Sequence, residues 1–186
     1  MIKKIVYLTG FMASGKSTIG PILANTLGWD FFDLDKLVEL SANKSIRKIF
    51  EEDGEEYFRN LETETLTKTT QLENHIIALG GGTIASEINL EIIQSAGFLI
   101  YLESSPEETY KRLRFKRDRP ALLFDSDEEP SKIEFMEKIN SLLQTRVKYY
   151  NQADFKITTD NVPVGKAIDK LSNIIRKEFY GETNKS

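Results

Sequence analysis

The chain has 186 residues, a formal net charge of −4 and a pI of about 5.3. This length supports one substantial core, so we expect a single domain over residues 1–180 and a frayed polar tail over 181–186. The acidic balance argues against nucleic acid as a partner, and no apolar run reaches the roughly 18 residues that a membrane span needs. The absence of cysteine excludes disulfides and thiolate chemistry. Because the first residues lack a signal-peptide pattern, we expect a cytoplasmic protein.

Short apolar runs alternate with amphipathic stretches along the chain. The expected strands are Ile5–Thr9, Trp29–Phe32, Ile76–Leu79, Phe98–Leu102 and Phe155–Thr158. Helical patterns separate these strands, including one from about Lys132 to Tyr150. Such alternation is typical of βαβ units around a parallel sheet. We therefore predict a three-layer α/β domain.

A phosphate-binding motif follows the first expected strand. Residues Gly10-Phe11-Met12-Ala13-Ser14-Gly15-Lys16-Ser17 match G-x-x-x-x-G-K-[ST]. Glycines let the backbone wrap around phosphate, the lysine reaches the β and γ oxygens, and the serine hydroxyl binds Mg²⁺. The alternative is a chance glycine-rich turn, which the strand-loop-helix context disfavours. We expect ATP to contact Met12, Ala13, Ser14, Gly15, Lys16, Ser17 and Thr18. The motif predicts a phosphotransferase that moves the γ-phosphate of ATP onto a small acceptor.

Two acids, Asp33 and Asp35, follow the second expected strand. In a parallel sheet, that strand ends at the same edge as the phosphate loop. We expect an extended D-x-D segment, in which alternation points both carboxylates the same way, and we assign Asp33 to Mg²⁺ and Asp35 to the acceptor hydroxyl. The alternative is an N-cap for a helix that starts near Lys36.

Four further segments carry a family resemblance. They are Ile49–Glu62, which reads F-x-x-x-G-E-x-x-F-R-x-x-E from Phe50, then Gly80-Gly81-Gly82, Arg119-Pro120, and Arg146 with Tyr150. With the phosphate loop and the two acids, the chain resembles the shikimate kinases from about residue 5 to residue 175. The resemblance implies a P-loop kinase fold with sheet order 2-3-1-4-5 and a mobile lid at about 112–130. It also implies a monomer.

The same resemblance implies roles for individual residues. Shikimate is expected to contact Asp35, Arg59, Gly81, Gly82 and Arg146, with both arginines on its carboxylate. Arg119 is expected on the lid over the phosphates, and Arg112 near the adenine.

The residue types agree with an anionic acceptor. Arg146 lies on an apolar helical stripe, where a guanidinium needs an anion and can bind a carboxylate with two hydrogen bonds. The alternative is an ion pair with an internal acid. Glu62 follows Arg59 by three residues and can fix its side chain, or the two can form a surface salt bridge. The glycine run can admit substrate to the backbone or be a loose turn.

The basic segment Lys111–Arg119 can be a lid that closes on phosphate or a solvated helix end. Two features depart from the family pattern. Arg146-Val147-Lys148-Tyr149-Tyr150 lacks a proline that relatives carry, and Thr159–Val162 lacks an arginine that contacts adenine in some of them.

We predict that shikimate and ATP-Mg²⁺ give shikimate 3-phosphate and ADP. Lys16, Arg119 and Mg²⁺ bound by Ser17 and Asp33 would stabilise charge, while Asp35 positions the hydroxyl. The rival interpretations are a kinase for another small metabolite and a nucleotide-binding regulatory module without turnover.

Overall fold

A five-stranded parallel sheet forms the centre of the molecule, which we describe from a computed structural model covering residues 4–114 and 131–181. The strands are β1 (Ile5–Thr9), β2 (Asp30–Asp33), β3 (His75–Ala78), β4 (Phe98–Glu103) and β5 (Phe155–Thr158). Their order is β2-β3-β1-β4-β5, and every neighbouring pair is parallel. The predicted fold class and strand order are therefore confirmed.

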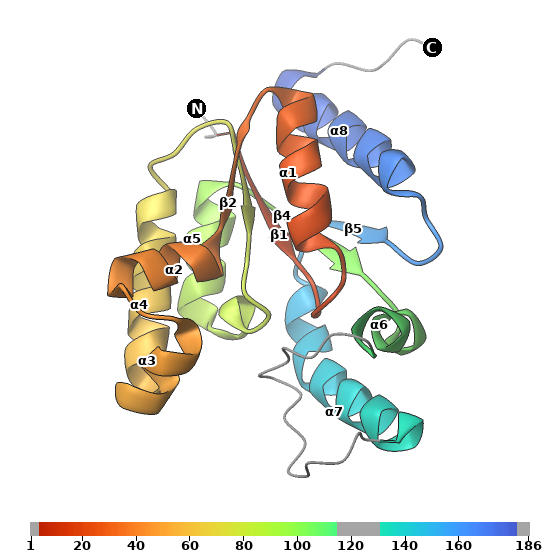
Figure 1. The fold of residues 1–186 in the computed structure, drawn as a ribbon. Helices are drawn as coiled ribbons and strands as arrows, with labels where there is room; N and C mark the ends of the chain where they lie inside the picture. Colours follow the sequence, from red (N-terminus) through yellow and green to blue (C-terminus); the bar gives the residue numbers. More distant parts are fainter. Residues whose placement is uncertain (1–3, 115–130, 182–186) are drawn as a thin grey trace.

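Helices cover both faces of this sheet (Figure 1). They are α1 (Lys16–Leu27), α2 (Leu34–Ala42), α3 (Ile46–Glu52), α4 (Gly54–Thr69), α5 (Glu87–Ala96), α6 (Pro106–Leu113), α7 (Lys132–Tyr150) and α8 (Val164–Tyr180), with a 3₁₀ turn η1 (Thr83–Ala85). Helices α1 and α8 pack together on one face. Residues of α4, α5 and α7 pack on the other. The sheet is thus the middle of three layers.

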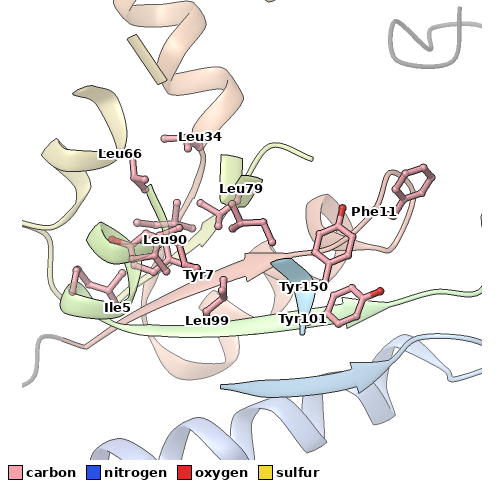
Figure 2. Close-up of a cluster of buried hydrophobic side chains, with 14 of the residues drawn as sticks. Ile5, Tyr7, Phe11, Leu34, Leu66, Leu79, Leu90, Leu99, Tyr101 and Tyr150 are labelled. Carbon is pink, nitrogen blue, oxygen red and sulfur yellow. The ribbon is translucent and has the colours of Figure 1, made fainter. Parts of the chain in front are cut away.

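Alternate residues of each strand enter separate cores on the two faces. In β1, Ile5 and Tyr7 pack beneath α4, α5 and α7, whereas Val6 and Leu8 pack beneath α1 and α8. All four are fully buried, as the continuous apolar runs of parallel strands require. Figure 2 shows the first of these cores.

Local sequence signals explain the helix boundaries. Helix α7 begins with a capping box in which Ser131 and Glu134 bind each other's backbone N–H, and it spans the predicted range. Helix α2 begins at Leu34, two residues before the predicted start, because Asp33 is its N-cap. Among the helices of the described ranges, none is long and apolar enough to cross a membrane.

Candidate active site

The carboxyl ends of three strands meet at one edge of the sheet. Leu8 of β1 is level with Ala78 of β3, which is in turn level with Asp33 of β2. The phosphate loop after β1, the glycine turn after β3 and the acids after β2 therefore start from one row, as predicted for an open parallel sheet.

The phosphate loop connects β1 to α1 through two glycines with positive φ. Gly10 has a φ of 150°, and a Cβ there would lie 2.5 Å from the carbonyl oxygen of Leu102. Gly15 has a φ of 106° and is the N-cap of α1, which has no side-chain cap and no acid in its first turn. No side chain caps the N–H groups at this helix end, which suits them to an anion such as phosphate.

Lys16 folds back over this loop. Its Nζ donates to the carbonyl oxygens of Gly10 at 2.7 Å and Phe11 at 3.2 Å. Burial lowers the pKa of Lys16 to about 8, although the nearby carboxylates of Asp35 and Asp33 act to raise it. The charged form of Lys16 is therefore stabilised by attraction to the two carboxylates.

The expectation of an extended D-x-D segment is wrong. The side chain of Asp33 caps α2, with Oδ1 accepting from the N–H groups of Asp35 at 3.1 Å and Lys36 at 3.4 Å. Asp35 thus lies in the first helical turn, so strand alternation does not set its direction. The N-cap alternative holds for Asp33, and it leaves the carboxylate's second oxygen without a hydrogen bond among the described residues.

Asp35 has the largest pKa shift among the acids of the described ranges. Burial, together with the charges of Asp33 and Glu62, raises its pKa to about 6, and the charge of Lys16 opposes this rise. A carboxyl with this pKa is still mostly ionised at neutral pH and is a stronger base than an exposed aspartate.

Each glycine of the turn after β3 faces one predicted site residue. A Cβ on Gly80 would lie 2.5 Å from Oδ1 of Asp35, and one on Gly81 would lie 3.0 Å from Nη1 of Arg146. A Cβ on Gly82 would lie 3.3 Å from both Nη1 and Nη2 of Arg59. The alternative of a loose turn therefore finds no support, because the missing side chains of these glycines leave room for three charged groups.

Arg59 is held by two carboxylates of its own helix, α4. Nη1 donates to Oε2 of Glu62 at 3.0 Å, while Nε and Nη2 donate to Oε1 of Glu55 at 3.3 Å and 3.2 Å. The Glu62 side chain is 2% exposed, which rules out the surface salt bridge considered above, whereas that of Glu55 is 67% exposed.

Arg146 projects from α7 toward the same turn. Its guanidinium carbon lies 5.6 Å from the centre of the Phe11 ring. Burial raises the pKa of the neighbouring Tyr150, and the Arg146 charge opposes that rise. Within residues 4–114 and 131–181, no carboxylate lies within ion-pair distance of Arg146. The alternative of an internal ion pair thus finds no support in this part of the chain.

A cavity of about 400 Å³ opens between α4, the glycine turn and α7. Its walls carry both arginines, and its lining residues are Glu55, Arg59, Gly82, Ala85, Ser86, Thr145, Arg146 and Tyr149. Two guanidinium groups on one small cavity favour an organic anion, and specifically a carboxylate that can accept paired hydrogen bonds.

Arg112 lies behind the phosphate loop. Its Nη1 donates to the carbonyl oxygen of Ala13 at 3.1 Å and to Oγ1 of Thr159 at 3.2 Å, and its Nη2 donates to the Thr159 carbonyl oxygen at 2.8 Å. Arg112 therefore connects the loop to the segment after β5. Arg119 and most of the predicted lid lie outside the described residues.

The donors predicted for Mg²⁺ suit that ion. Ser17 is exposed in the first turn of α1, and Asp33 keeps one carboxylate oxygen outside its capping bonds. Among the described residues, no three acids or histidines are placed so that they could hold a metal ion together. A hydroxyl and a carboxylate are a sufficient protein share for Mg²⁺ held by substrate phosphates and water.

Several residues of the site were absent from the sequence-based prediction. Glu55 could have been found from its i, i+4 spacing to Arg59 on one helix. Thr83, Asn89 and Tyr149 carry no motif or periodic signal, because their contacts join separate segments of the chain.

Comparisons with known proteins agree with this geometry. A family model described as shikimate kinase matches residues 12–176. The shikimate kinase of Chlorobaculum tepidum is 45% identical over 175 residues, which cover 94% of this chain and 92% of that protein. The crystal structure of shikimate kinase from Bacteroides thetaiotaomicron has a TM-score of 0.82 at 30% identity, covering 92% of this chain and 98% of that one. The shikimate kinase from Acinetobacter baumannii in complex with shikimate has a TM-score of 0.83 at 30% identity, covering 95% and 94%.

Proposed function

The chain belongs to the shikimate kinase family, and we propose which of its residues act as it transfers the γ-phosphate of ATP to the 3-hydroxyl of shikimate. The products are shikimate 3-phosphate and ADP, on the route to chorismate and the aromatic amino acids. The observation that carries the assignment of residues is the glycine turn, which brings the Asp35 carboxylate and the Arg59 and Arg146 guanidiniums to one place.

The two arginines are proposed to bind the carboxylate of shikimate. Both line the cavity beside Gly82, and their forks can each hold a carboxylate. Gly81 and Gly82 present their backbone to the substrate on the remaining side. Among the described residues Arg146 has no carboxylate partner, and a neutral acceptor would leave its charge unpaired in the cavity, which disfavours a kinase for a neutral sugar.

Asp35 is proposed to orient the 3-hydroxyl and to accept its proton as the O–P bond forms. Its pKa of about 6 lets it do so near neutral pH better than an ordinary aspartate could. Phosphoryl transfer needs little proton removal early in the reaction, so placing the hydroxyl in line is the larger part of this role.

The phosphate loop is proposed to hold ATP through backbone N–H groups of Met12–Thr18 and through Lys16. Lys16 must leave the carbonyl oxygens of Gly10 and Phe11 to reach the phosphates. Mg²⁺, held by Ser17 and Asp33, would screen the phosphate charge. Arg112 is proposed to support the adenine side of the site, and Arg119 to neutralise the transferring phosphoryl group.

We also propose that residues 1–180 act as one domain, that the protein is a monomer, and that it works in the cytoplasm where ATP is available. Neither nucleic acid nor membrane has a role in this reaction.

The test is ADP release in a coupled assay with ATP and Mg²⁺, comparing shikimate with gluconate and nucleoside monophosphates. We expect turnover with shikimate alone. Asp35→Asn should abolish turnover and keep ATP binding, and Arg146→Ala should raise the KM for shikimate far more than that for ATP. Turnover with gluconate but not shikimate would overturn the substrate. Equal rises in both KM values would remove Arg146 as a carboxylate anchor.

A further inference from the structure

We propose that Thr83 and Asn89 are positioning residues for substrate binding, which act on Arg59 through the buried carboxylate of Glu62. This inference rests on the proposed role of Arg59 as an anchor for the shikimate carboxylate. It concerns how Arg59 is held in place and which residues outside the cavity determine the affinity of the site for shikimate.

Thr83 fixes one oxygen of Glu62 and so frees the other for Arg59. The Thr83 hydroxyl donates to Oε1 of Glu62 at 2.7 Å, while Oε2 of Glu62 accepts from Nη1 of Arg59 at 3.0 Å. Thr83 is 0% exposed and Glu62 is 1% exposed. With both oxygens occupied, the carboxylate cannot rotate without leaving a buried polar atom unpaired, which is costly.

Asn89 fixes Thr83 in turn. Its Nδ2 donates to the carbonyl oxygen of Thr83 at 3.0 Å, and its Oδ1 accepts from the hydroxyl of Thr63 at 2.7 Å. The two bonds use opposite ends of the amide, so they define its orientation. Asn89 is itself 1% exposed. The three buried members of the network, Glu62, Thr83 and Asn89, are therefore bonded to one another or to α4 and not to bulk water.

The network joins the two structural elements that form the carboxylate site. Arg59, Glu62 and Thr63 belong to α4, whereas Thr83 follows directly after Gly82, whose backbone lies against the Arg59 guanidinium. A hydrogen-bonded loop thus leaves α4, crosses η1 and α5, and returns to α4. It sets the separation between the arginine and the glycine turn, which a carboxylate held by both must match.

The first variant is Thr83→Val, which keeps the shape of the side chain and removes the donor to Glu62. We expect the KM for shikimate to rise about tenfold, with the KM for ATP unchanged and kcat within about threefold, because an anchor has moved while the reacting groups have not. Thr83→Ser keeps the hydroxyl and should restore the KM. Asn89→Ala should also raise the KM for shikimate.

Thr69→Val is the matched control. Like Thr83, Thr69 is a buried threonine, but it lies at the end of α4. Its hydroxyl bonds to Tyr7 and to the Leu66 carbonyl oxygen, away from the cavity. We expect it to lower the urea midpoint of unfolding and leave the KM for shikimate unchanged. If Thr83→Val only lowers the midpoint, as this control does, then Thr83 is structural and the inference is overturned.

Arg59→Ala separates this inference from the proposed function. If it leaves the KM for shikimate unchanged, Arg59 is not an anchor and both proposals about it fall. If it raises the KM while Thr83→Val does not, only the network fails. We expect the double variant Arg59→Ala, Thr83→Val to bind shikimate no worse than Arg59→Ala alone, because Thr83 acts through the arginine. Additive losses would contradict the route through Glu62.

Discussion

The backbone of Gly82 lies against the guanidinium of Arg59, with the place of a Cβ only 3.3 Å from Nη1 and from Nη2. Gly82 has a φ of −111° and a ψ of −6°, which other residues adopt. A glycine is therefore needed here for the room it leaves and not for its backbone freedom. The position of Arg59, the proposed anchor, therefore depends on residue 82 having no side chain.

Gly82→Ala should move Arg59 without unfolding the protein. We expect the KM for shikimate to rise roughly tenfold and the urea midpoint to change little, because the added methyl displaces the end of one side chain. Michaelis kinetics with shikimate and ATP varied separately would measure the effect. Gly165→Ala in α8 is the control, since a Cβ there meets nothing within 4 Å. An unchanged KM for Gly82→Ala would show that Arg59 tolerates displacement.

We expect Glu55 to compete with the substrate for Arg59, the proposed anchor of the shikimate carboxylate. Its exposed carboxylate occupies the Nε and Nη2 edge, which is one of the edges that bind a carboxylate side by side. Exposed ion pairs contribute about 0.2–1 kcal/mol, so Glu55→Gln should lower the KM for shikimate by up to about fivefold. Glu56→Gln alters the next, exposed acid of α4 and should leave the KM unchanged. A higher KM for Glu55→Gln would mean that Glu55 orients the arginine for the substrate.

Several element boundaries could be expected before the structure from local patterns, whereas the strand order had another source. Strand β5 and helix α7 occupy their predicted ranges because each has a regular apolar period, and α7 also has a capping box. The order of the strands came from the family resemblance, which the phosphate loop and the Phe50–Glu62 segment carry.

The directions of side chains in the site could not be predicted in the same way. The error at Asp35 followed from placing the start of α2 two residues late. Side chains repeat every two residues in a strand and every 3.6 residues in a helix, so Asp35 points in a different direction in the helix than it would in a strand. The pairing of Gly80 with Asp35 and the link from Glu62 through Thr83 to Asn89 join segments that are far apart in sequence. No pattern within one segment reports such contacts.

Asp35→Asn should stabilise the substrate-free protein at neutral pH. The pKa of Asp35 rises from 3.8 to about 6 on folding, so its favourable contribution is complete below pH 3.8 and is lost as the pH rises through about 6. At about pH 7.5 the ionised side chain costs roughly 3 kcal/mol, and this figure already includes the attraction to Lys16. We expect Asp35→Asn to gain up to about 3 kcal/mol.

Urea unfolding at about pH 7.5 and about pH 4.5 measures this gain. It should fall to about a third at the lower pH, where Asp35 is protonated in the folded protein. Asp169→Asn, on the exposed face of α8, is the control and should show no such dependence. A loss of stability at pH 7.5 would mean that attraction to Lys16 outweighs the burial of Asp35.

Ala13 has a φ of 58°, a left-handed conformation that costs an alanine about 1–2 kcal/mol and a glycine almost nothing. Ala13→Gly should therefore stabilise the protein by about 0.5–1 kcal/mol, after about 0.4–1 kcal/mol is lost to the greater freedom of the unfolded chain. The carbonyl oxygen that accepts from Arg112 is unchanged by this substitution. We expect the KM for ATP to stay within about twofold, because the loop keeps its shape.

Ala24→Gly tests the same change where the backbone is right-handed. Ala24 is buried in α1, and glycine there should destabilise the protein by at least about 1 kcal/mol. Opposite signs for the two variants in urea unfolding would establish strain at Ala13. If Ala13→Gly destabilises the protein as Ala24→Gly does, the packing of the Ala13 methyl outweighs its backbone strain.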